Sequence, residues 1–139
     1  MSYSKQLDQY QKQAVTGASP LQLIVMLYDG ALKFLTAGKE AMLQKDLYRQ
    51  NDQIQRAQRI ITELMSCLDM EKGGDVATNL FALYSYAYNE IIMGNVEDDP
   101  AKLDHAITVL TQLRESWVIL DQQARNQAMG GDYDIPAAA

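Results

Sequence analysis

The chain contains 139 residues, of which 47% are hydrophobic, and it carries a formal net charge of -6. This is the length of one domain, and a domain of this size buries roughly two thirds of the surface of its unfolded chain, enough for one real core. The acidic balance and the absence of a Lys and Arg cluster argue against a nucleic-acid-binding protein. A single cysteine, Cys67, excludes an internal disulfide and fits a reducing compartment.

Membrane and secretion signals are missing from the sequence. Residues 1–8 lack the apolar core of a signal peptide, and nowhere does the chain hold about 18 uninterrupted apolar residues. We therefore expect a cytoplasmic protein without membrane insertion.

The first predicted helix spans residues 19–43. Ser19 suits the N-cap, Pro20 the first helical position and Gln22 the reciprocal site of a capping box. Apolar residues then recur at steps of three and four over a broad arc: Leu23, Ile24, Leu27, Tyr28, Ala31, Phe34 and Leu35.

A second helix is predicted over residues 46–69, where the apolar positions form a bundle seam: Ile54, Ala57, Ile61, Leu64 and Leu68. The glycine pair at 73–74 indicates a helix stop, and Asp75 is expected to cap the next helix. Because this turn is short, the second and third helices are expected to be antiparallel neighbours.

The third predicted helix, residues 75–94, carries two apolar stripes about 100° apart. One stripe holds Val76, Leu80, Leu83 and Ala87, and the other holds Phe81, Tyr84, Tyr88 and Ile92. Since a bundle helix needs one apolar stripe, the second stripe is surplus and suggests a binding surface.

The fourth predicted helix, residues 99–127, begins with Asp99 and Pro100 and continues through Leu103, Ile107, Leu110, Leu113, Trp117 and Leu120. Residues 1–18 form an N-terminal arm or short helix, and residues 128–139 have the composition of a flexible tail. The fold class predicted is all-α, an antiparallel up-down four-helix bundle with a disordered C-terminal tail.

Catalytic chemistry finds little support in the sequence. The one histidine, His105, has Lys102 three residues before it, so the carboxylate and histidine pair of a di-iron bundle cannot form. Cys67 is interpreted as a buried or half-buried helix residue, because activating cations are absent around it. We expect no enzyme, no cofactor and no bound metal.

Several blocks of the sequence resemble the FliS family of flagellin-specific export chaperones. They are Ala18-Ser19-Pro20, Met26-Leu27-Tyr28-Asp29-Gly30-Ala31, Glu71-Lys72-Gly73-Gly74 after Leu68-Asp69, and Leu113-Arg114-Glu115 with Trp117. The resemblance runs from about Tyr10 to Trp117. It implies a helical bundle that binds the disordered C-terminal segment of flagellin in the cytosol, prevents premature polymerisation and supports delivery to the flagellar type III export apparatus.

The sequence departs from the family at a few positions. Glu90 and Glu97 are acidic where the family is typically basic, so a partner contact that needs positive charge there is in doubt.

The candidate groove for a partner helix comprises Ile60, Phe81, Tyr84, Tyr88 and Ile92. A second interpretation is that these residues enlarge the core or are covered by the arm, whose Leu7, Tyr10 and Val15 could cover the groove or anchor a bound client. A third is that the surplus stripe is the face of a structural homodimer without a flagellin client.

Overall fold

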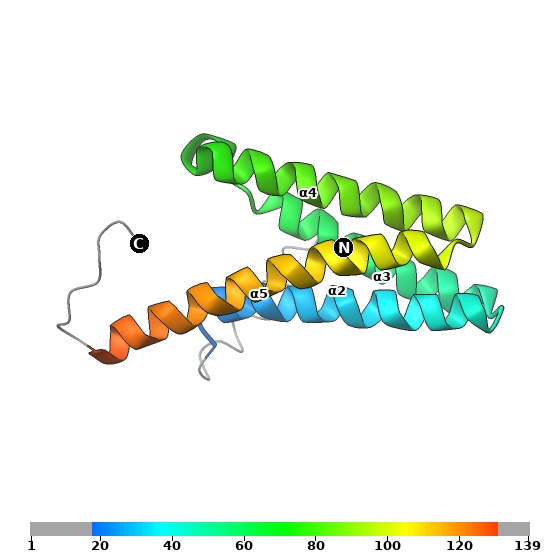
Figure 1. The fold of residues 1–139 in the computed structure, drawn as a ribbon, viewed down its shortest axis with the longest axis horizontal. Coiled ribbons are helices and arrows are strands. Elements are labelled where there is room, and N and C mark those ends of the chain that lie inside the picture. Colours follow the sequence, from blue (N-terminus) through cyan, green and yellow to red (C-terminus); the bar gives the residue numbers. More distant parts are fainter. Residues whose placement is uncertain (1–17, 131–139) are drawn as a thin grey trace.

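The computed structural model describes residues 18–130; for residues 129 and 130 it describes the backbone alone. Over this range the chain forms four helices: α2 (Pro20–Leu43), α3 (Leu47–Ser66), α4 (Met70–Glu97) and α5 (Pro100–Gly130). Successive helices run antiparallel, with α4 and α5 crossing in front of α3 and α2 (Figure 1). α2 and α4 each pack against both α3 and α5, which confirms an all-α four-helix bundle.

The start of α2 has the predicted capping box. The hydroxyl of Ser19 accepts from the backbone N–H of Gln22 at 3.1 Å, and the Gln22 side chain accepts from the N–H of Ser19 at 2.7 Å, with Pro20 at the first position. These bonds satisfy two of the N–H groups that a helix start leaves without partners.

Small residues bring α2 and α3 close together. Ala31 and Ala57 are fully buried, and a Cβ added to Gly38 would lie 2.6 Å from Cγ1 of Ile54. The backbone of α2 therefore approaches Ile54 at a distance that only glycine allows at position 38.

The start of α4 differs from the prediction. The carboxylate of Asp69 accepts from the N–H groups of Glu71 and Lys72, so the helix begins at Met70 and the first turn forms before the glycine pair. Gly74 then has φ 54° and ψ -130°, a conformation that strongly favours glycine. The extra turn from Met70 was not predicted, but Gly74 has the positive φ expected of the glycine pair and separates this short first turn from the rest of α4.

One apolar stripe of α4 faces the core: Ala77, Tyr84, Ala87, Ile91 and Gly94 are buried. The two-stripe interpretation is corrected on two points. Tyr84, assigned to the surplus stripe, lies in the core beside Ala87, whereas Val76, assigned to the core stripe, is 68% exposed. Val76 and Ala77 are neighbours on the same segment after the kink at Gly74, and it is Ala77 that faces the core.

α4 continues past its predicted end. Gly94 is buried where α5 begins, and the helix stops at Glu97 because Asp98 takes a left-handed conformation with φ 53°. Asp99 then caps α5, accepting from the N–H of Ala101 at 3.0 Å. The far end of α5 extends beyond the start of α2 (Figure 1).

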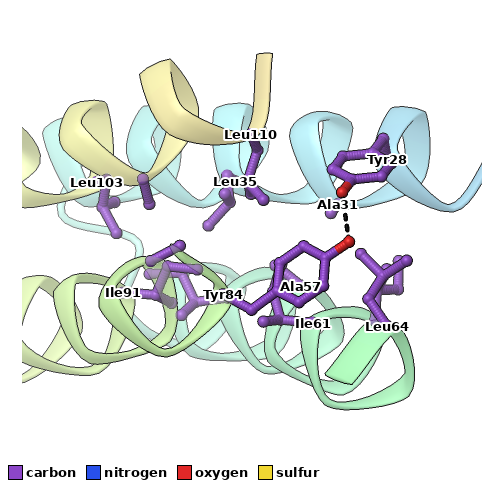
Figure 2. Packing of buried hydrophobic residues seen from close by; sticks show 14 of the residues in the cluster. Tyr28, Ala31, Leu35, Ala57, Ile61, Leu64, Tyr84, Ile91, Leu103 and Leu110 are labelled. Carbon is purple, nitrogen blue, oxygen red and sulfur yellow. Dashed lines mark hydrogen bonds between the residues drawn. The ribbon is translucent and has the colours of Figure 1, made fainter. Parts of the chain in front are cut away.

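All four helices contribute to the core, which includes Leu35, Ile61, Ile91 and Leu103, all fully buried (Figure 2). Within the described range α2 is the one helix long and apolar enough to span a membrane by length and composition. Its buried residues pack in this core, which accounts for that apolar character.

Candidate functional site

An apolar pocket opens at the end of the bundle where α2 and α4 begin and α3 ends. Its volume is about 250 Å³. α2, the end of α3, α4 and α5 all supply residues to its lining: Pro20, Leu23, Ile24, Leu27, Leu64, Cys67, Leu68, Tyr84 and Trp117. We call this the end pocket.

The first half of α4, beside the end pocket, presents apolar side chains to solvent. Met70 is 47% exposed, Phe81 43% and Leu83 39%. Phe81 and Leu83 are two residues apart and point to different sides of α4, so these exposed side chains do not form a single face.

Two residues that line the end pocket, Tyr84 and Trp117, form hydrogen-bond contacts with the buried Tyr28. The hydroxyls of Tyr28 and Tyr84 lie 2.5 Å apart, and the indole N–H of Trp117 donates to the hydroxyl of Tyr28 at 3.1 Å. Figure 2 shows the two hydroxyls meeting end to end. Burial raises the pKa of both tyrosines, so both hydroxyls keep their protons at neutral pH.

Cys67 lies at the rim of the end pocket, just past the last residue of α3. The residue as a whole is exposed at the C-cap of α3, which corrects the expectation of a buried or half-buried helix position. Partial burial, followed by the negative charge of Glu63, raises the pKa of the thiol. A thiol of this kind is a poor nucleophile at neutral pH.

A second, more open hollow of about 480 Å³ lies between α2 and α5, lined by Ala18, Gln22, Val25, Met26, Val118, Asp121 and Arg125. The buried carboxylate of Asp121 accepts from the hydroxyl of Ser19 at 3.0 Å and pairs with Arg125 at 3.1 Å. These bonds tie the start of α2 to the last turns of α5.

The predicted groove residues do not lie on one surface. Ile60 and Tyr84 are buried, at 7% and 1% exposed, so in the chain alone they belong to the core. Tyr88 is half-buried in a small polar hollow against α3, Ile92 is half-buried, and Phe81 is exposed. The structure thus brings one of the five, Tyr84, to the end pocket.

The arm residues Leu7, Tyr10 and Val15 lie outside the described residues. Most of the end pocket was not predicted as a site, although its α2 residues carry a signal in the sequence. The apolar arc of α2 is wider than one seam requires, and Ile24 is the residue that extends it toward the pocket.

Titratable side chains do not assemble into a reaction centre in residues 18–130. No group of three or more His, Cys, Asp or Glu side chains there could hold a metal ion. His105 is exposed and its Nδ1 lies 2.6 Å from the carboxylate of Glu90, an ion pair between α5 and α4 when the ring is protonated.

The four helices and the apolar pocket at their end define an all-helical bundle with a candidate binding site. The profile of the family described as "Flagellar protein FliS" matches residues 3–124. The chain belongs to the FliS family.

Named relatives agree with this assignment. The flagellar secretion chaperone FliS of Vibrio cholerae is 37% identical over 115 residues, covering 80% of this chain and 85% of that protein. The flagellar secretion chaperone FliS of Salmonella typhimurium is 35% identical, covering 82% and 85%, and that of Bacillus subtilis is 31% identical, covering 87% and 90%. These relatives are named as chaperones, a non-enzymatic family.

Proposed function

We propose that this protein is an export chaperone that binds the disordered C-terminal segment of flagellin in the cytosol, prevents its premature polymerisation and supports its delivery to the flagellar type III export apparatus. The observation that carries the proposal is the end pocket with the exposed apolar residues of α4 beside it. Family membership supports the chaperone role.

The physical basis is the apolar surface of an unassembled subunit. A segment that would otherwise pair head to tail with further copies can grow open filaments, and covering its apolar side blocks that growth. Because a disordered segment is ordered only when it binds, it can cover a large surface and still be released for export.

The first test is calorimetric titration with a synthetic flagellin C-terminal segment, followed in parallel by circular dichroism. We expect saturable one-to-one binding, a gain of helix and a negative heat-capacity change. Ile24→Gln, a half-buried pocket residue, should weaken binding, while Tyr48→Gln, 85% exposed at the opposite end of α3, should not. Equal affinity of the two variants would move the client site away from the end pocket.

The N-terminal arm gives a second component of the proposal. We expect Leu7, Tyr10 and Val15 to cover apolar surface when no client is bound, or to anchor the bound client. Deleting residues 2–15 should then change self-association, client affinity or both. The proposal fails if light scattering and calorimetry show neither changed.

A structural homodimer without a flagellin client is the alternative function. Exposed Leu83 and Tyr86, three residues apart on one side of α4, favour it, because an apolar helix face can pair with a second copy. Light scattering separates the two functions: a dimer that persists with the flagellin segment present supports the homodimer, and a monomeric one-to-one complex supports the chaperone.

A further inference from the structure

A small polar hollow lies between α3 and α4, apart from the end pocket. Its volume is about 180 Å³, and five side chains line it, four from α3 and one from α4: Gln55, Gln58, Arg59, Thr62 and Tyr88. All five are polar, and the one formal charge among them is the positive charge of Arg59. We call this the Arg59 hollow.

Arg59 differs from the other four arginines of the chain. Each of those pairs with a carboxylate: Arg49 with Glu40, Arg56 with Asp52, Arg114 with Asp29 and Arg125 with Asp121. The guanidinium of Arg59 pairs with no carboxylate of residues 18–130, although the chain has more acidic than basic side chains. Its N–H donors are therefore open to a ligand.

The carboxylate nearest to Arg59 in sequence is turned to other partners. Glu63 follows Arg59 by four residues, but its Oε2 accepts from the hydroxyl of Ser66 at 3.3 Å and from the thiol of Cys67 at 3.5 Å. A basic residue placed four positions before an acidic one is also the less favourable order for an ion pair within a helix. The charge of Arg59 thus stays available at the hollow.

Tyr88 adds a second donor to the hollow. It is half-buried, and its hydroxyl bonds to no other residue in the part of the chain that the structure describes. No fully buried side-chain oxygen or nitrogen there lacks a hydrogen-bond partner, so the Tyr88 hydroxyl is accessible from outside. The hydroxyl of Thr62, in contrast, already donates to the carbonyl of Gln58 at 2.9 Å.

We infer that the Arg59 hollow binds a carboxylate group of a partner polypeptide, with the guanidinium of Arg59 pairing with the carboxylate and the Tyr88 hydroxyl donating to it. The planar guanidinium matches the two oxygens of a carboxylate. One cation balances the single charge of a carboxylate, whereas a phosphate group carries nearly two negative charges at neutral pH and would keep an excess. The site does not depend on flagellin being the client.

The size of the hollow sets the class of ligand. A cavity of about 150 Å³ holds a benzene molecule, which has more heavy atoms than an acetate group. At about 180 Å³, the Arg59 hollow has room for a carboxylate and the methylene that carries it. An acidic side chain and the C-terminus of a chain both present this group.

Matched arginine variants test the site. We would titrate the protein with the peptide N-acetyl-Gly-Glu-Gly-amide at constant ionic strength and follow the NMR signals of the backbone amides of residues 58–62 and 88. Arg59→Gln should weaken saturable binding about tenfold. Arg56→Gln removes the same charge from an arginine that already pairs with Asp52, and should leave binding unchanged. Equal losses in the two variants would overturn the inference.

Tyr88→Phe tests the second donor. It should weaken binding of the same peptide less than Arg59→Gln does, because a hydrogen bond from a neutral donor is weaker than one from a cation. Circular dichroism and thermal melting check that each variant folds. Unchanged affinity in Tyr88→Phe would remove the hydroxyl from the site.

Further peptides separate the sources of the carboxylate. N-acetyl-Gly-Gln-Gly-amide has no carboxylate, and N-acetyl-triglycine has one at its C-terminus alone. Binding of the glutamate peptide or of N-acetyl-triglycine, with none of the glutamine peptide, supports the inference and identifies the source. Shifts that grow without saturation for all three, or tighter binding of inorganic phosphate, would overturn it.

Discussion

At the scale of single residues, the contact between α2 and α3 depends on glycine. A Cβ at position 38 would lie 2.6 Å from Cγ1 of Ile54, an atom near the backbone with little freedom to move. A Cβ at position 30 would lie 3.2 Å from Cδ1 of Ile60, the mobile end of its side chain. Two glycines on the same helix therefore have different tolerance for a methyl group.

We predict that Gly38→Ala lowers the free energy of unfolding by about 1–3 kcal/mol, because it overpacks the contact between the helices. Gly30→Ala is the matched control, since alanine favours a helix over glycine by about 1 kcal/mol and offsets its milder contact. Urea unfolding of both variants measures the difference. Equal stability of the two would contradict the close approach at Gly38.

The raised pKa of Cys67 predicts how the reactivity of its thiol changes with pH. The thiolate is disfavoured in the folded chain, so alkylation by iodoacetamide should be slower than in the urea-unfolded chain and should rise only at more alkaline pH. By linkage, this thiol's contribution to stability is complete below the unfolded pKa and is lost as pH rises through the folded pKa.

Glu63 is the second cause of that shift, after burial. Glu63→Gln should therefore speed alkylation, while Glu40→Gln, an exposed carboxylate on α2, should not. A rate that is identical in the folded and unfolded chains across the pH range would show that the thiol is unperturbed.

At the scale of elements, the last turns of α5 are held to the start of α2 by the bond from Ser19 to Asp121. We predict a coupling energy of about 0.5–3 kcal/mol between Ser19→Ala and Asp121→Ala in a double-mutant cycle of unfolding free energies. Ser19→Ala alone also removes the N-cap of α2, which lowers the free energy of unfolding by about 1 kcal/mol.

Lys39→Ala is the control for this cycle, because Lys39 pairs with Asp104 and with neither Ser19 nor Asp121, and a partly exposed ion pair contributes under about 1 kcal/mol. Its effect should add to that of Ser19→Ala. Additive effects of Ser19→Ala and Asp121→Ala would mean that the bond does not hold the two helices together.

Some features of the helices are predictable from the sequence and others are not. The class of fold, the capping box of α2 and the cap and proline of α5 are local signals, and the structure has them all. The positive φ of Gly74 agrees with the glycine pair in the sequence. The cap at Asp69, which starts α4 before that pair, was not predicted, because Asp69 and Asp75 are both suitable caps by residue type.

The candidate site was harder to predict because it is built from four separated segments. Aromatic Tyr84 was recognised as a site residue from its spacing, but its burial depends on α2 and α5, which bring Tyr28 and Trp117 to it. Leu64 and Leu68 were predicted as seam residues and Leu23 as part of the apolar arc of the first helix. Their spacing does not show that an open pocket lies between them.

At the scale of the whole molecule, the two ends of the bundle differ. The end pocket lies at the end of the bundle where α3 finishes. At the opposite end α2 connects to α3, and Asp46 caps the start of α3. We predict that the flagellin segment slows hydrogen exchange in residues 20–27, 64–72 and 113–120, and leaves residues 43–50 unchanged. Mass spectrometry of exchanged peptides measures this, and protection confined to residues 43–50 would refute the assignment of the site.

The bond from Ser19 to Asp121 also bears on how the chain folds while it is being made. Its two residues are 102 positions apart, and α5 supplies the partner surface for both α2 and α4. α2 and α3 can pair as soon as both have left the ribosome, but contacts distant in sequence form late. Until α5 emerges, the apolar sides of α2 and α4 stay uncovered, so the nascent chaperone passes through a stage at which it is itself prone to aggregate.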